Sequence, residues 1–260
     1  MISLAVGTYN IQTWNEIYPT SWSLRRSRVA AVLRKYAFDV IGLQEAKDGP
    51  MDYLCADGTY AHIGVARQDP IEEYGSEYSS IFYRKDMFKV LDDNTFWLSE
   101  TPEVVASKSW GSSLARVCTY GHFLHMQSGQ EFYYFNTHLD HISWDARREG
   151  LKLIVERMRP AIASGKPCFL TGDLNTTPER PELRVLDGVM NDARFISETT
   201  PTGPETTFNA FDLSNPSRFL RIDYIYTTPG IKVKTYHVCD DLVEGQLPAD
   251  HYPVVAKVEF

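Results

Sequence analysis

Polar side chains stand at the ends of apolar, strand-like runs throughout this sequence, and their types suit a hydrolytic metal site. Carboxylates and amides offer hard oxygen ligands, which Mg²⁺ or Mn²⁺ prefers and zinc does not. The set comprises Asn10, Glu45, His138, Asp173, Asn175, Asp223, Asp250 and His251. Asp223 is the hardest to explain by structure alone, because a carboxylate between Ile222 and Tyr224 costs free energy unless it is paired or ligated.

Each of these residues also has an ordinary structural interpretation when it is taken alone. Asn10 after a strand is a common turn former, and the GDLN sequence with Asp173 and Asn175 matches a common Asx turn. Glu45 could cap or flank a helix, and His138 could be a satisfied structural histidine. Only their joint occurrence, in this order and at the ends of strands, favours a functional site.

The runs that carry these residues are rich in Val, Ile, Tyr and Phe, which is typical of β-strands. Strands are expected at 4–11, 39–45, 78–84, 115–126, 131–139, 166–175, 220–227, 231–238 and 251–260. One amphipathic helix is expected from about Ser23, with Val29, Val32 and Leu33 on one face, and a second from about Trp144.

Many strands with two long helices, each lying between strands, favour stacked sheets over a regularly alternating parallel sheet. We therefore expect an α/β fold, a four-layer α/β sandwich in which two packed, mostly antiparallel sheets are flanked by helices. Residues 1–260 are expected to form a single catalytic domain, because the chain is 43% hydrophobic and has no low-complexity tract. In such sheets, polar residues that end apolar strands tend to converge on one rim.

The charge and the cysteines narrow the class of protein. A net charge of −8 disfavours binding of long duplex nucleic acid, which depends on Lys and Arg, although a locally basic cleft or a bound cation can reverse the field at a site.

No run approaches the roughly 20 apolar residues of a membrane helix, so we expect a cytoplasmic protein. The widely spaced Cys55, Cys118, Cys168 and Cys239 predict buried thiols. No obligate protein partner is indicated.

Six fragments in this order resemble the motifs of the endonuclease/exonuclease/phosphatase superfamily. They are TYNIQ (8–12), GLQE (42–45), NTHLDH (136–141), LTGDLNTTP (170–178), RIDYIY (221–226) and ADHYPV (249–254). The superfamily includes deoxyribonucleases, abasic-site endonucleases, deadenylases, inositol polyphosphate phosphatases and bacterial sphingomyelinases. The stretch 96–123 resembles the central segment of bacterial members near the deadenylase-like branch.

The resemblance implies a role for each motif residue. On the metal side, Asn10 and Glu45 hold Mg²⁺ or Mn²⁺, with Glu45 as the principal ligand, and Asp250 is a further carboxylate beside the metal.

On the catalytic side, the resemblance implies that Asp173 and Asn175 face the attacking water and the phosphate, while His138 stabilises phosphate oxygens. Asp223 is implied to orient His251. Asp173 is our choice for the general base that activates the water. His251 is the alternative, because a carboxylate partner would set its tautomer and raise its basicity.

Substrate selectivity should come from segments outside the motifs. Arg116 is a candidate for binding a phosphate group, although an ordinary cross-strand ion pair would account for it equally well. Trp110, amid Ser and Gly, is a candidate loop residue for stacking a base or sugar, whereas Trp97 is better explained as a core aromatic.

We therefore expect a divalent-metal-dependent hydrolase, a phosphodiesterase or phosphatase, that cleaves a small or single-stranded phosphate ester. A DNA or RNA endonuclease or exonuclease is the catalytic alternative, and the acidic balance and lack of a basic arm disfavour it. A sphingomyelinase-type lipid phosphodiesterase is a still weaker hypothesis, because no long apolar hairpin is evident. From another class comes a catalytically silent binding module of the same fold, which the intact motif positions argue against.

Overall fold

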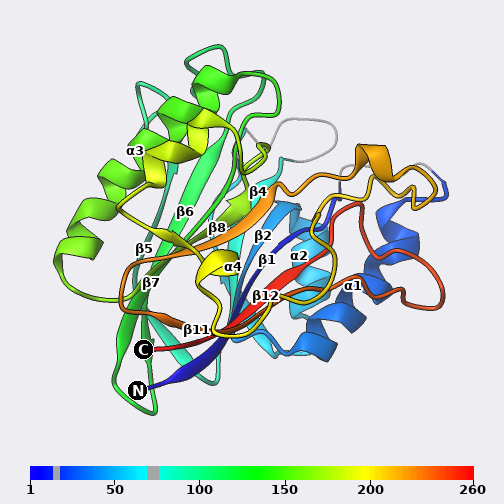
Figure 1. Cartoon of the computed structure of the whole chain (residues 1–260), viewed down its shortest axis with the longest axis horizontal. Helices are drawn as coiled ribbons and strands as arrows, with labels where there is room; N and C mark the ends of the chain where they lie inside the picture. The colour runs from blue at the N-terminus through cyan, green and yellow to red at the C-terminus, as the bar shows by residue number, and fades with distance from the viewer. Residues whose placement is uncertain (14–17, 69–75) are drawn as a thin grey trace.

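Two β-sheets stack face to face at the centre of the fold, and helices lie on their outer sides (Figure 1). The structure is a computed structural model and describes residues 1–13, 18–68 and 76–260. The first sheet has the order β11 (Lys232–Val238), β12 (Val254–Glu259), β1 (Ser3–Asn10), β2 (Val40–Ala46), β4 (Tyr78–Arg84) and β3 (Tyr60–Ile63). The second has the order β5 (Phe88–Trp97), β6 (Val117–His125), β7 (Glu131–His138), β8 (Cys168–Asp173), β10 (Asp223–Thr227) and β9 (Asn191–Asp192).

The direction of each strand pair follows from the connection between the strands. Strand β1 pairs with β2 and β7 pairs with β8 in parallel, whereas the other described pairs are antiparallel. Helix α1 (Trp22–Tyr36) connects β1 to β2, and α3 (Trp144–Ala163) connects β7 to β8. Parallel neighbours need such a crossover, whereas antiparallel neighbours need only a turn. The two predicted helices and the mostly antiparallel sheets are thus confirmed.

Three hydrophobic clusters separate four layers. The cluster between the sheets includes Val6, Val40, Ile81, Phe123, Tyr134, Phe169, Ile225 and Val254. Outside the first sheet, Val29 and Leu33 of α1 belong to one cluster with Ile41 of β2. Outside the second sheet, Ile154 of α3 belongs to one cluster with Leu170 of β8. The predicted four-layer sandwich is confirmed.

A buried polar network fixes the two sheets relative to one another. Asn136 of β7 donates hydrogen bonds to the carbonyls of Leu43 (3.0 Å) and Ser80 (2.8 Å) in the first sheet. Its Oδ1 accepts one from Gln44 Nε2 at 2.7 Å. Gly42 leaves room for this amide, because a Cβ there would lie 2.2 Å from Asn136 Oδ1. Fully bonded polar groups in a core favour one alignment of the surrounding elements over others.

Every strand expected from the sequence is present, but some elements were not foreseen. The unforeseen ones are β3, β5, β9, α2 (Asp48–Cys55), α4 (Ala193–Ile196) and the 3₁₀ turns η1 (Pro181–Leu186) and η2 (Pro216–Arg218). Strand β5 lies at a sheet edge and its middle is exposed, so it lacks the apolar alternation that marks a strand. Cys118, Cys168 and Cys239 are buried as predicted, and Cys55 is half-buried.

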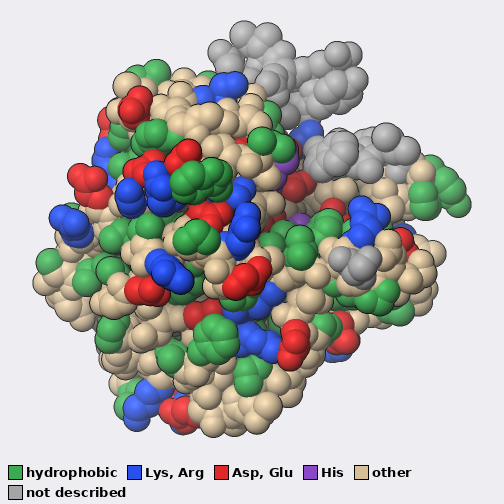
Figure 2. All heavy atoms as spheres, turned by 45° about the horizontal axis from the view of Figure 1, so that its top comes forward, with side chains coloured by type: hydrophobic (Ala, Val, Ile, Leu, Met, Phe, Trp, Pro, Cys, Tyr) green, Lys and Arg blue, Asp and Glu red, His purple; other side chains and the backbone are tan. Residues whose placement is uncertain are grey.

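The surface that bears the strand ends is hollowed. Figure 2 shows histidine and acidic side chains gathered in a depression on this face. None of the helices in the described part of the chain combines the length and apolar character needed to span a bilayer.

Candidate active site

The strand register brings the motif residues of the second sheet together. Strands β7 and β8 run parallel, so His138 and Asp173 are paired at their carboxyl ends. Strand β10 runs antiparallel to β8 and begins with Asp223 opposite Asp173. The side chains of this pair are also close, since His138 Nε2 lies 3.5 Å from Asp173 Oδ2. Three polar residues that are far apart in sequence therefore share one rim of the sheet.

Asn10 joins this rim to the first sheet. Its Nδ2 donates to Glu45 Oε1 at 2.9 Å and to Asp173 Oδ2 at 3.0 Å. Glu45 has a φ of 57°, and the β2–β4 register shifts between Gln44 and Ala46. A left-handed residue at such a bulge stores strain and re-aims its side chain, which is common at functional sites. The bulge accounts for a carboxylate that lines a cavity from within an otherwise buried strand.

His251 is held by a buried carboxylate. Its Nδ1 lies 2.8 Å from Asp223 Oδ2, and its Nε2 lies 3.7 Å from Asp173 Oδ2. Burial alone would lower the pKa of His251, but the charges of Asp223, Asp173 and Asp250 outweigh it and raise the pKa to about 10. The edge of the Phe208 ring packs on the imidazole, with ring centroids 4.9 Å apart. At neutral pH this imidazole is therefore a cation with protons on both nitrogens, and Asp223 and Phe208 fix the orientation of its ring.

Asp173 and its neighbours form the centre of the site. Burial and the Asp223 charge raise the pKa of Asp173 to about 6. Its Oδ1 accepts the Asn175 backbone N–H at 2.9 Å, and Asn175 Nδ2 donates to the Leu139 carbonyl at 3.0 Å. Burial and the charge of Arg116 hold the pKa of His138 well below its usual value, so this imidazole is neutral.

The residues expected on the metal side leave buried oxygens without partners. Within the described residues, neither Glu45 Oε2 nor Asp250 Oδ1 has a hydrogen-bond partner. Burial and the charge of Glu77 raise the pKa of Glu45 to about 8, and burial raises the pKa of Asp250. Buried carboxylates without cationic partners are costly. Their oxygens therefore fit a hard divalent cation.

A second group could also hold a cation. Asp173, Asp223 and His251 each place one potential ligand atom within 4.8 Å of the others. Asp223 Oδ1 is also without a hydrogen-bond partner among the described residues, but Asp223 holds His251 through its other oxygen and does not line the cavity, as Glu45 and Asp250 do. We therefore favour the Glu45 side of the site.

A cavity of about 450 Å³ collects most of the predicted site residues. Those that line it are Glu45, Arg116, His138, Asp173, Asn175, Asp250 and His251. Asn10 and Asp223 lie behind the lining and are hydrogen-bonded to it. Trp110 is not brought into this cavity and instead borders a separate hollow with Glu100 and Lys152.

The cavity also contains residues that the sequence did not single out, namely Arg67, Glu77, His141, Leu114, Phe208, Leu220 and Ile222. His141 could have been found, because it ends the NTHLDH motif. Arg67 had no such signal. Its carbonyl accepts the Trp97 indole N–H at 2.7 Å, and Trp97 itself is buried, as predicted for a core aromatic.

Comparison with known proteins identifies the family of the chain. The sequence model of the Endonuclease/Exonuclease/phosphatase family matches residues 7–251, and the chain belongs to this family. The family resemblance seen in the motifs is confirmed, and the relatives of this fold include phosphatases. No curated protein matches the chain.

Three solved structures illustrate the similarity. An endonuclease/exonuclease/phosphatase from Bacteroides vulgatus is 31% identical with a TM-score of 0.93, and the match covers 100% of both chains. A mannosyl-6-phosphatase from Bacteroides thetaiotaomicron is 33% identical with a TM-score of 0.90, over 99% of this chain and 100% of that one. The catalytic domain of human Nocturnin with a bound sulfate anion shares the fold at 18% identity and a TM-score of 0.77, over 99% of this chain and 93% of that one.

Proposed function

We propose that residues 1–260 form one catalytic domain that hydrolyses phosphate esters with a divalent metal ion, Mg²⁺ or Mn²⁺. The observation that carries the proposal is the pair of unpartnered buried oxygens on Glu45 and Asp250, in the same cavity as Asp173 and His251. Glu45 and Asp250 would hold the ion, and Asn10 fixes Glu45 by its hydrogen bond. When bound, the ion supplies Lewis-acid charge to the phosphate oxygens.

Asp173 acts in this proposal as the general base on the attacking water. Its Oδ2 lies between two imidazoles, 3.5 Å from His138 Nε2 and 3.7 Å from His251 Nε2. Because His251 Nδ1 is engaged with Asp223, only Nε2 faces the cavity, where it can donate to a phosphate or leaving oxygen. The carboxylate accepts a proton and the imidazole donates one, which favours Asp173 over His251 as the base.

His138 and Asn175 position the phosphate, and Arg116 binds its oxygens. His138 is neutral, and its Nε2 offers one hydrogen bond toward the cavity. Asn175 contributes less freely, because its Nδ2 already donates to a carbonyl. Trp110 has no part in the proposed site, because it borders a different hollow.

The substrate class that we favour is a small phosphate ester. The similarity to a mannosyl-6-phosphatase supports a phosphatase acting on a sugar-sized ester. A nuclease acting on the end of a single strand is the second candidate. It is favoured by Phe208 and Leu220, which give the cavity an apolar side on which a base could rest.

A substrate screen tests the proposal. Purified protein should be assayed with Mg²⁺ or Mn²⁺ against sugar phosphates, nucleotides, oligonucleotides, inositol phosphates and phospholipids, with Asp173→Asn as the matched inactive control. We expect turnover of at least one class by the wild-type protein and none by the variant. Absence of turnover across the panel, or equal turnover by Asp173→Asn, would favour the catalytically silent binding module.

A further inference from the structure

Two buried arginines form one wall of the reactive cavity. Arg116 is 4% exposed and Arg67 is 7% exposed, and both line the cavity beside His138. Within the described residues, Arg116 Nε and Nη1 and Arg67 Nε have no hydrogen-bond acceptor. Leaving a buried charged donor unsatisfied is costly, so buried guanidiniums are normally fully bonded. This wall therefore has unused capacity to bind an anion.

The surroundings of Arg116 leave two of its nitrogens without hydrogen-bond acceptors in the described part of the chain. The nearest carboxylate oxygen, Asp140 Oδ2, lies 4.0 Å from Arg116 Nε. That oxygen already accepts from Ser112 Oγ, Ser113 N and Ser113 Oγ at 3.1, 2.9 and 2.7 Å. Arg116 Nη2 lies 3.0 Å from His141 Nδ1, an imidazole whose pKa is lowered by burial and by Arg116 itself. Asp140 thus lies close enough to offset the charge of Arg116 but does not accept a hydrogen bond from it.

Arg67 is held rigidly at the same wall. Its Nη2 lies 2.9 Å from Glu77 Oε2, its backbone N–H donates to the Glu77 carbonyl at 2.9 Å, and its own carbonyl accepts from Trp97. Glu77 pairs with Arg67 and Asp140 lies near Arg116, so what the two arginines offer is N–H donors without acceptors rather than a net charge. Burial and the nearby Arg67 charge lower the pKa of Arg116 to about 10.

We propose that Arg67 and Arg116 form a recognition site for a terminal, doubly charged phosphate group, which makes the enzyme prefer phosphomonoesters to phosphodiesters. The inference rests on the proposed function, because it names the substrate class of the same cavity. A monoester presents three unesterified oxygens and two negative charges near neutral pH, whereas a diester presents two such oxygens and one charge. Arginine binds phosphate through strong, charge-assisted hydrogen bonds, so the dianion gains more from this wall.

The same cavity has apolar lining that fits the remainder of such a substrate. Phe208, Leu220 and Ile222 contribute this apolar surface. The single organic group of a monoester can contact it while the phosphate binds the arginines. A diester has one unesterified oxygen fewer to accept hydrogen bonds from the arginines.

The first test compares one monoester with one diester. Turnover of p-nitrophenyl phosphate and of bis-p-nitrophenyl phosphate should be measured for the wild type, Arg67→Gln, Arg116→Gln and Arg116→Lys. We expect Arg116→Gln to lower kcat/KM for the monoester by about tenfold or more, the scale of a lost hydrogen bond to a charged group, with a smaller effect on the diester. Arg116→Lys keeps the charge without the planar donors and should fall between.

Arg221→Gln is the matched control. Arg221 is also buried, but it pairs with Asp192 at 2.6 Å and does not line the reactive cavity. Its loss should leave the monoester-to-diester ratio of kcat/KM unchanged. A ratio that is unchanged in Arg67→Gln and in both Arg116 variants would overturn the proposal.

The second test measures binding without turnover. Titration calorimetry with inorganic phosphate, in the presence of EDTA, should detect binding to the wild type and weaker binding to Arg67→Gln and Arg116→Gln. Equal affinity in all three proteins would overturn the arginine site. Weaker binding by the variants would support the site even if no ester were hydrolysed, an outcome that would reject only the proposed function. If Arg116→Gln does not fold, Arg67→Gln and Arg116→Lys decide both tests.

Discussion

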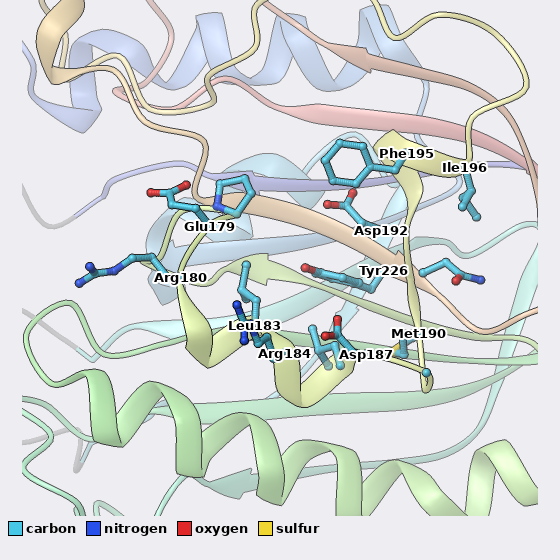
Figure 3. A pocket seen from close by; sticks show the side chains of 14 residues that line it. Glu179, Arg180, Leu183, Arg184, Asp187, Met190, Asp192, Phe195, Ile196 and Tyr226 are labelled. Atoms are coloured by element: carbon cyan, nitrogen blue, oxygen red, sulfur yellow. The ribbon is translucent and has the colours of Figure 1, made fainter.

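Two cavities of similar size differ in how their polar groups are satisfied. The reactive cavity measures about 450 Å³, and a second cavity between η1, α4 and β10 measures about 520 Å³. Figure 3 shows Phe195, Asp192, Tyr226 and Leu183 around this second cavity. The half-buried carboxylate of this cavity, Asp192, accepts from Arg221 at both oxygens, at 2.6 and 2.7 Å.

The reactive cavity has the opposite character. There, carboxylate oxygens of Glu45 and Asp250 and guanidinium nitrogens of Arg67 and Arg116 all lack partners in the described part of the chain. Single unpartnered atoms occur elsewhere too, Arg221 Nε among them, but in the reactive cavity they are gathered on both carboxylates and guanidiniums, which indicates a site that binds a ligand. The polar lining, rather than the volume, therefore distinguishes the candidate active site. Four experiments test this difference.

Metal removal should have the largest effect. We expect EDTA to abolish ester hydrolysis and Mg²⁺ or Mn²⁺ to restore it, because in the proposed site the unpartnered oxygens of Glu45 and Asp250 hold the ion. Thermal unfolding supplies an independent measurement, in which Mg²⁺ should raise the Tm of the wild type but not of Glu45→Gln. Full activity after exhaustive chelation would show that the metal assignment is wrong.

Loss of the central carboxylate or imidazole should come next. Asp173→Asn and His251→Ala are each expected to lower kcat by about a hundredfold or more, the scale of a lost general acid or base. Asp173→Asn should not lower the Tm, because it removes a negative charge beside Asp223, whereas His251→Ala should lower the Tm, because it leaves the buried Asp223 carboxylate without its partner. Asp192→Asn in the second cavity is the control and should keep kcat. An active Asp173→Asn would contradict the assigned role.

Substrate size should have a smaller effect on kcat/KM. Single-stranded ends and small esters should have higher kcat/KM than duplex DNA, because most contacts of a long duplex would fall on a protein of net charge −8. Arg116→Ala should raise KM as well as slow turnover, since it removes a phosphate contact. Kinetics at matched low and moderate salt would measure both effects. Efficient nicking of supercoiled DNA that survives Arg116→Ala would instead favour an endonuclease.

The smallest effect is expected in the second cavity. Phe195 is 73% exposed there, and Phe195→Ala should change kcat/KM by less than about twofold, as for other surface substitutions away from a site. The kcat/KM of Phe195→Ala should be measured with the same substrates and salt conditions as that of Arg116→Ala. A loss comparable to that of Arg116→Ala would mean that the substrate extends into both cavities and that the contrast between them is misleading.

The sequence was sufficient where a local pattern carries the information. The strand ends at Asn10, Glu45 and Asp173 are marked by apolar runs that stop at a polar residue. The long helices are marked by the helical periodicity of their apolar residues. Strand β5 escaped prediction because its exposed middle depends on its place at a sheet edge.

The site residues that were missed depend on tertiary contacts. Arg67 joins the cavity through Trp97, 30 residues further along the chain, and through Glu77, so no local signal marks it. Trp110 is the opposite case, because the sequence singled it out and the structure places it outside the cavity. Its Ser and Gly neighbours indicate a loop, but composition does not determine which way the loop faces, and the Trp110 carbonyl is fixed by Ser143 Oγ at 2.8 Å.

The hydrogen bonds of Asn10 make the reactive centre a joint between two independently hydrogen-bonded sheets. Glu45 belongs to one sheet and Asp173 to the other, so any sliding of one sheet over the other changes the separation of these two groups. The amide of Asn136, which touches no predicted catalytic residue, prevents that sliding through its bonds to Leu43 and Ser80. The Asn136 amide, deep between the sheets, therefore limits how far Glu45 and Asp173 can move relative to each other at the rim.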